Sequence, residues 1–91
     1  MEVFAVFDSK SDSFCLPFFE KSKSLGIRAF MGSVCDSDSK LNVFPDDFSL
    51  FHLSGFDEVT GVFSSFDSPV LLMSGIDALR QYRKMVSSEV N

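Results

Sequence analysis

The chain has 91 residues, a formal net charge of −5 and a hydrophobic content of 45%. This length fits one domain, and we expect residues 1–91 to form it. The acidic charge argues against a duplex-DNA-binding domain, which is usually basic, but it is compatible with protein partners and with a local basic patch.

The two cysteines and the N-terminal residues indicate a cytosolic protein. Cys15 and Cys35 belong to no metal-binding or redox motif, so we expect them to be reduced core residues. The first ten residues, MEVFAVFDSK, have neither a basic segment nor a long apolar run, so we expect no signal peptide. No window approaches the roughly 20 apolar residues that a membrane-spanning helix needs.

The first twenty residues predict two strands. Residues 2–8 alternate with apolar side chains on both faces, which is typical of a central strand. Residues 14–19 predict a second strand. Because Pro17 has no N–H to donate to the ladder, we expect this strand to lie at an edge of the sheet or to contain a bulge.

Residues 22–36 predict a helix, because apolar residues recur there with helical spacing. The stripe consists of Ile27, Phe30, Met31 and Val34. Ser22 or Ser24 can cap the start of this helix. Gly26 weakens it by about 1 kcal/mol relative to alanine. Residues 36–42 predict a polar loop.

Residues 43–66 predict a β-hairpin, with a turn built from Asp57, Glu58, Thr60 and Gly61. Residues 67–69 predict a break, and residues 70–73 fit either a strand or a first helical turn. Ser74 and Asp77 match a capping box, so we expect the last helix to begin at Gly75. Its apolar side is expected to contain Ile76 and Leu79, together with Met85 or Val86.

The element order β-β-α-β-β-(β)-α predicts a two-layer α+β domain with a mostly antiparallel sheet and two helices. Twelve phenylalanines are a large apolar load for 91 residues. The phenylalanine-rich sheet has more apolar surface than two short helices can cover, so we expect a homo-oligomer.

Catalysis has little support in the sequence. His52 is the only histidine, and it alternates with leucines in a predicted strand without a partner base or nucleophile. Asp36, Asp38 and Lys40 resemble the start of a calcium loop, but lysine stands at the third ligand position, and the glycine and distal glutamate are missing. We therefore expect a non-enzymatic protein without a metal or another cofactor.

Basic residues form two clusters. Arg80, Arg83 and Lys84 stand at helical spacing near Tyr82, and a second cluster at the first helix consists of Lys21, Lys23 and Arg28. Cations beside an aromatic ring are what a single-stranded nucleic-acid site needs. The alternative is that the last helix uses its cations to complement its C-terminus and to solvate an outer face, which the acidic charge favours.

Several ordered motifs resemble the small nonstructural protein of gokushoviruses, single-stranded DNA phages of the Microviridae that include the chlamydial phages. They lie in FAVFDSKSDSFCLPFFEKSKSLGIRAF and FPDDFSLFHLSGFDEVTGVF. The matching residues are Phe7-Asp8, Pro17-Phe18-Phe19, Arg28-Ala29-Phe30, Pro45-Asp46-Asp47-Phe48-Ser49-Leu50, and Gly55-Phe56-Asp57 with Gly61. The resemblance covers roughly residues 3–66 and leaves out the basic part of the last helix.

The resemblance implies a nonstructural protein in the cytoplasm of the infected bacterium. It implies a role in viral DNA replication, at the stage of single-stranded DNA synthesis, by binding DNA or phage or host replication proteins. It supplies no catalytic residues. The alternative is a protein–protein adaptor or assembly factor without DNA contact. Salt-dependent binding to a single-stranded oligonucleotide distinguishes the two functions.

Overall fold

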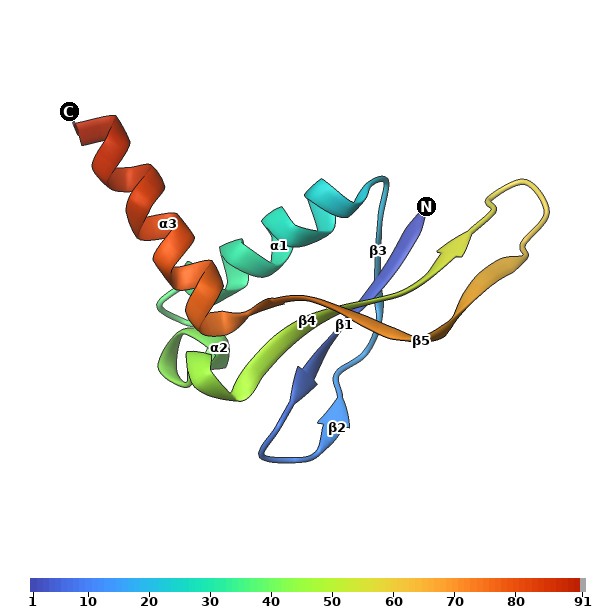
Figure 1. Ribbon diagram of the computed structural model, residues 1–91, viewed down its shortest axis with the longest axis horizontal. Coiled ribbons are helices and arrows are strands. Elements are labelled where there is room, and N and C mark those ends of the chain that lie inside the picture. The colour runs from blue at the N-terminus through green and yellow to red at the C-terminus, as the bar shows by residue number, and fades with distance from the viewer. Residues whose placement is uncertain (91) are drawn as a thin grey trace.

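The computed structural model describes residues 1–90, with side chains as far as Ser87. A five-stranded sheet carries its helices on one side (Figure 1). In chain order the elements are β1 (Glu2–Asp8), β2 (Ser13–Phe14), β3 (Phe18–Glu20), α1 (Lys23–Cys35), α2 (Lys40–Val43), the 3-10 helix η1 (Pro45–Asp47), β4 (Phe48–Phe56), β5 (Phe63–Ser74) and α3 (Gly75–Val90). The strand pairings among the described residues are all antiparallel, which confirms the predicted α+β class.

β1 is a central strand, as its two apolar faces predicted. It pairs with β4 along one side and with both β2 and β3 along the other, in the sheet order β2-β1-β4-β5. The prediction of one strand over residues 14–19 is wrong, because the chain leaves the ladder around Pro17 and divides it into β2 and β3. The N–H of Cys15 still donates to the carbonyl of Val6 at 2.7 Å, which keeps this segment beside β1.

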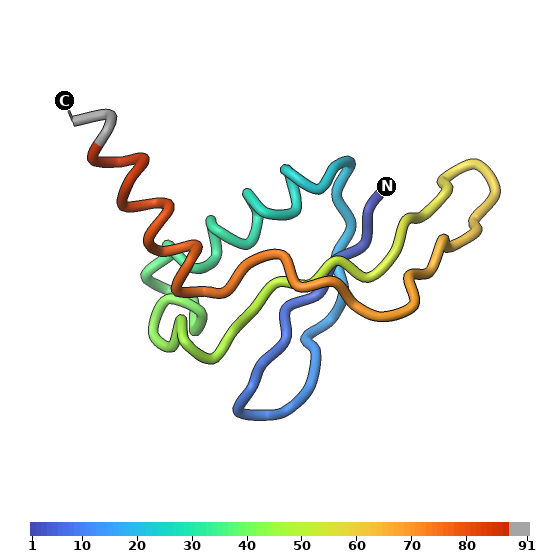
Figure 2. Tube along the Cα trace, viewed as in Figure 1, coloured from blue at the N-terminus to red at the C-terminus, as the bar shows by residue number. Residues whose placement is uncertain are grey.

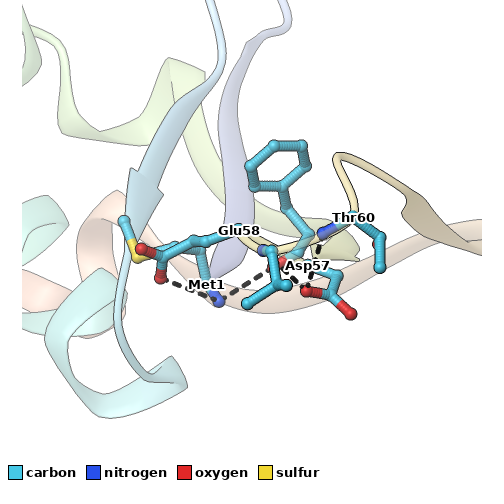
Figure 3. Close-up of polar contacts among 6 residues, drawn as sticks. Met1, Asp57, Glu58 and Thr60 are labelled. Carbon is cyan, nitrogen blue, oxygen red and sulfur yellow. Dashed lines mark hydrogen bonds and ion pairs between the residues drawn. The ribbon is translucent and has the colours of Figure 1, made fainter.

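β4 and β5 form the predicted hairpin, but its first strand begins at Phe48 and not at Val43, because Val43 ends α2 and Pro45–Asp47 form η1. The acidic turn at its tip meets the N-terminal residue (Figure 3). The N–H groups of Val59 and Thr60 donate to Oδ1 of Asp57 at 2.8 and 3.3 Å. The terminal ammonium of Met1 donates to the carbonyl of Phe56 at 3.0 Å and lies 3.9 Å from Oε1 of Glu58. These contacts tie the turn to the start of β1.

β5 continues through the predicted break at residues 67–69 and includes residues 70–73. His52 pairs with Val70 and Ser54 pairs with Ser65, so four residues of β5 stand opposite one residue of β4. Pro69 lies in this bulge, where its missing N–H interrupts no ladder bond. The break is therefore a local irregularity of a longer strand.

The core lies between the sheet and α1, with contributions from α2 and α3. Phe30 and Val34 of the predicted helical stripe are buried, while Ile27 and Met31 pack partly buried against them. The other buried members of this cluster are Phe4, Leu41, Phe48, Leu50 and Ala78. The amphipathic spacing of α1 thus identified the face that packs on the sheet.

α1 lies close to the sheet because Gly26 has no side chain. A Cβ atom at this position would lie 2.6 Å from Cε2 of Phe4 and 2.7 Å from its Cε1. Phe4 is fully buried, and its ring stacks with those of Phe18 and His52 at centroid distances of 5.5 and 5.0 Å. The glycine that weakens the isolated helix therefore allows the helix to contact this ring.

The two longer helices begin at the capping serines that the sequence predicted. Oγ of Ser22 accepts a hydrogen bond from the N–H of Leu25 at 3.2 Å, and Oγ of Ser74 accepts one from Asp77 at 3.0 Å, as expected for N-caps. The predicted loop 36–42 is only partly correct, since it leads into the four-residue helix α2. The side-chain amide of Asn42 in α2 donates to the carbonyl of Val34 at 2.9 Å and links α2 to α1.

Replacement of Gly26 by alanine is expected to destabilise the protein by up to about 2 kcal/mol. Overpacking against Phe4 costs about 1–3 kcal/mol, and this cost outweighs the gain in helix propensity of about 1 kcal/mol. Gly32 in the same helix is the matched control, because a Cβ atom there would have nothing within 4 Å. Gly32→Ala should raise stability by up to about 1 kcal/mol in urea unfolding; equal stabilisation by both variants would contradict the packing argument.

Asp57→Ala is expected to lower the melting temperature at neutral pH. The N–H groups of Val59 and Thr60 lower the pKa of Asp57 below its ordinary value of 3.8 by bonding to the charged carboxylate. The folded state thus holds the proton less tightly than the unfolded chain, so the stabilisation is present above pH 3.8 and disappears as the pH falls below it. Thermal melts at a series of pH values should show the difference in melting temperature between wild type and Asp57→Ala becoming smaller as the pH falls below 3.8. Glu58→Ala is the control, with a smaller effect at neutral pH because its ion pair is exposed.

Candidate functional surfaces on the helices and the sheet

The helices α1 and α3 diverge like the arms of a V (Figure 2). An open groove lies between them. Its volume is about 540 Å³. We call it the helical groove; it is lined by Ser24, Ile27, Arg28, Met31, Gly32 and Cys35 of α1 and by Gln81, Tyr82 and Met85 of α3. Most of these side chains are apolar or small, so the groove has an apolar floor with polar groups at its margins.

The outer half of α3 extends beyond the core. Ala78 is fully buried and Leu79 partly buried, but residues 80–87 are all exposed. Met85 or Val86 was expected on the apolar side of this helix. Their side chains remain 51% and 39% exposed, because the outer half of α3 points away from the sheet (Figure 1). The apolar stripe of α3 therefore continues into the helical groove instead of into the core.

The cations of α3 lie on two sides of the helix. Arg80 and Lys84 line a second hollow together with Asp77. Arg83 lies near Cys35 at the end of α1, where its charge lowers the pKa of the thiol and opposes the larger effect of burial, which raises it. The groove and its margins thus bring cations of α3 close to α1, while Asp77 reduces the positive potential of the second hollow.

The second predicted basic cluster is divided by the fold. Arg28 lines the helical groove and faces the same space as Tyr82. Lys21 precedes α1 and Lys23 begins it, whereas Cys35 ends it. The helix rise places Lys23 about 18 Å from Cys35. The structure therefore places Arg28 in the groove that Tyr82 also lines and leaves Lys21 and Lys23 at the end of α1 opposite Cys35.

His52 lies inside a packed and hydrogen-bonded arrangement. Its Nε2 atom is 2.9 Å from Oε1 of Glu2, its ring stacks on Phe4, and the ring of Phe66 meets it edge-on at a centroid distance of 4.7 Å. The side chain is only 12% exposed. These contacts explain why this histidine is held in the sheet, and they are structural in character.

Among the side chains that the structure describes, as far as Ser87, no group of three or more from His, Cys, Asp and Glu is arranged to hold a metal ion. Within residues 1–90, no helix combines the length and the hydrophobicity that crossing a membrane requires.

The sheet face opposite the helices carries phenylalanines that sequence reasoning did not assign. Two clusters of rings lie on it, the first formed by Phe7, Phe14 and Phe51 and the second by Phe19, Phe56 and Phe63. We call this surface the aromatic face. Alternation in β1 predicted apolar residues on both sides, but only the register between strands shows which phenylalanines meet.

The family model described as Phage ORF5 protein matches residues 1–78. The matched region includes the whole sheet, α1 and the beginning of α3, and it ends before Arg80. No curated protein and no solved structure matches the chain.

His52→Ala is expected to destabilise the fold by about 1–3 kcal/mol, because it removes a mostly buried ring and leaves Glu2 without that hydrogen bond. We expect no hydrolytic or transfer activity to depend on His52. Denaturant unfolding measures the stability. Phe44→Ala is the control: this ring is 58% exposed, so its removal should lower the stability less than the removal of the His52 ring. A His52→Ala protein that kept its stability but lost a measured turnover would contradict the structural role.

Proposed function

The chain belongs to the Phage ORF5 protein family, and from the ordered motifs within residues 3–66 we propose that it is a non-enzymatic accessory protein in viral DNA replication. In this proposal it binds single-stranded DNA in the cytoplasm of the infected bacterium during single-stranded DNA synthesis. The finer assignment to the gokushoviruses rests on the ordered motifs within residues 3–66. The binding surface rests on the residues of α1 and α3 described above.

The observation that supports DNA binding is the combination of cations and an exposed ring at the helical groove. Tyr82 is 44% exposed, lines the groove and shares it with Arg28. Arg83 lies near the Cys35 end, and Arg80 and Lys84 lie beside the groove on α3. A flexible single strand can place phosphates at the cations while a base stacks on the ring.

The acidic net charge does not prevent such local binding. Salt screens charges over about 8–10 Å, so distant carboxylates act weakly on a phosphate held at an arginine. Arginine and phosphate also match in geometry, because the guanidinium fork donates two parallel hydrogen bonds. Base stacking on Tyr82 would add about 1–3 kcal/mol per base.

A second candidate function is that of an adaptor that binds phage or host replication proteins without DNA contact. The aromatic face favours it, because this surface lies entirely within the region matched by the family model, whereas the cations of α3 lie beyond that region. Large exposed apolar surfaces are typical of protein–protein contacts.

The test of DNA binding is a salt series with a single-stranded oligonucleotide and a variant in which Arg80, Arg83 and Lys84 are alanine. For three lost phosphate contacts, the slope of log K against log salt should become less steep by about 2. Tyr82→Ala should weaken binding at every salt concentration without changing this slope.

Lys10→Ala with Lys40→Ala is the control variant, since these lysines line a separate hollow with Phe44 and Phe48. It should keep the wild-type slope. Unchanged affinity and slope in the triple variant would remove α3 from the binding site. Absence of wild-type binding at low salt would contradict DNA binding and favour the adaptor.

A further inference from the structure

The six phenylalanines of the aromatic face lie on one side of the sheet by register. Phe7 stands opposite Phe14, and Phe56 stands opposite Phe63. Residues paired across strands share a face, and alternate residues along a strand do so too. The rings of each cluster lie within 6.4 Å of one another, centroid to centroid. The two clusters therefore lie on the same face of the sheet, one beside Phe7 at the end of β1 and the other beside Val3 near its start.

This surface is separate from the core that the helices cover. None of its six rings belongs to the core cluster or to the side chains packed against it. Phe14, Phe19 and Phe63 are 44%, 42% and 52% exposed. Half of the twelve phenylalanines therefore lie on a sheet face that no described helix covers.

The aromatic face is also uncharged. The paired positions on it hold Val3, Ala5, Phe7, Phe14, Phe19, Ser49, Phe51, Ser54, Phe56, Phe63, Ser65, Leu71 and Ser74. A DNA backbone would find no cation among these residues, and a charged peptide would find no counter-charge. The matching partner is an apolar, uncharged protein surface.

We propose that a second copy of this chain covers the aromatic face and forms a symmetric dimer. A second copy presents the same uncharged rings, so the two chains of net charge −5 meet where neither carries charge. Such an isologous contact uses the same patch on both subunits and closes on itself, leaving neither face exposed. This dimer does not depend on DNA binding, although it would double the helical grooves.

The size of the surface fits the centre of such an interface. With about 200 Å² per ring side chain, the exposed parts of Phe14, Phe19 and Phe63 amount to roughly 280 Å². A standard interface buries about 800 Å² per partner, so these three rings would supply about a third of it and the surface around them the rest. The rings would form the apolar centre, with neighbouring serines and strand edges as the polar rim.

The test is the mass in solution by light scattering or sedimentation equilibrium at micromolar concentration. We expect twice the chain mass of 10.1 kDa for the wild type and a monomer for Phe63→Lys, which places a charge in the interface. Phe44→Lys is the matched control; this ring is 58% exposed between α2 and η1 and belongs to neither ring cluster, so the variant should stay dimeric.

Phe14→Lys on β2 is the second interface variant, and circular dichroism checks that each variant keeps its fold. Should one interface variant fail to fold, the other decides the outcome. A monomeric wild type would overturn the proposal and point to a different protein as the occupant. A dimer that survives the interface variants would overturn it as well, because the contact would then lie elsewhere on the chain.

Discussion

The contact between α1 and the sheet through Gly26 and Phe4 is the constraint on which the rest of the structure depends. Phe4 lies in the central strand and stacks between Phe18 and His52, so its ring occupies the middle of the helix-covered face. α1 can lie on this ring only because Gly26 has no Cβ atom. The helix then buries Phe30 and Val34 and forms one wall of the helical groove.

This arrangement makes the two faces of the sheet unequal. The helices cover the face of Phe4 and Leu50, while the opposite face keeps its rings at the surface. A domain of this size buries only part of its surface, and three helices of which one has four residues cannot cover both sides of the sheet. The molecule thus separates an uncharged aromatic surface from a basic, partly apolar groove.

The local signals in the sequence predicted much of the fold. Ser22 and Ser74 identified the starts of two helices, because a serine hydroxyl next to a helical stripe satisfies free N–H groups. The hairpin was predicted from its two strand-forming runs and the acidic turn. Pro17 correctly indicated an irregular edge strand, but the division into β2 and β3 and the bulge of β5 depend on pairing partners far away in the chain.

The sequence alone determined β1, α1, the start of α3, the hairpin turn, the α+β class and the excess of phenylalanine, since these follow from spacing, capping and composition. Only the tertiary structure decided what each candidate residue adjoins. It brought Arg28 to Tyr82, left Lys21 and Lys23 at the far end of α1, and placed six rings on one face. Helix crossing and strand register set these neighbours, and both depend on packing between residues distant in the sequence.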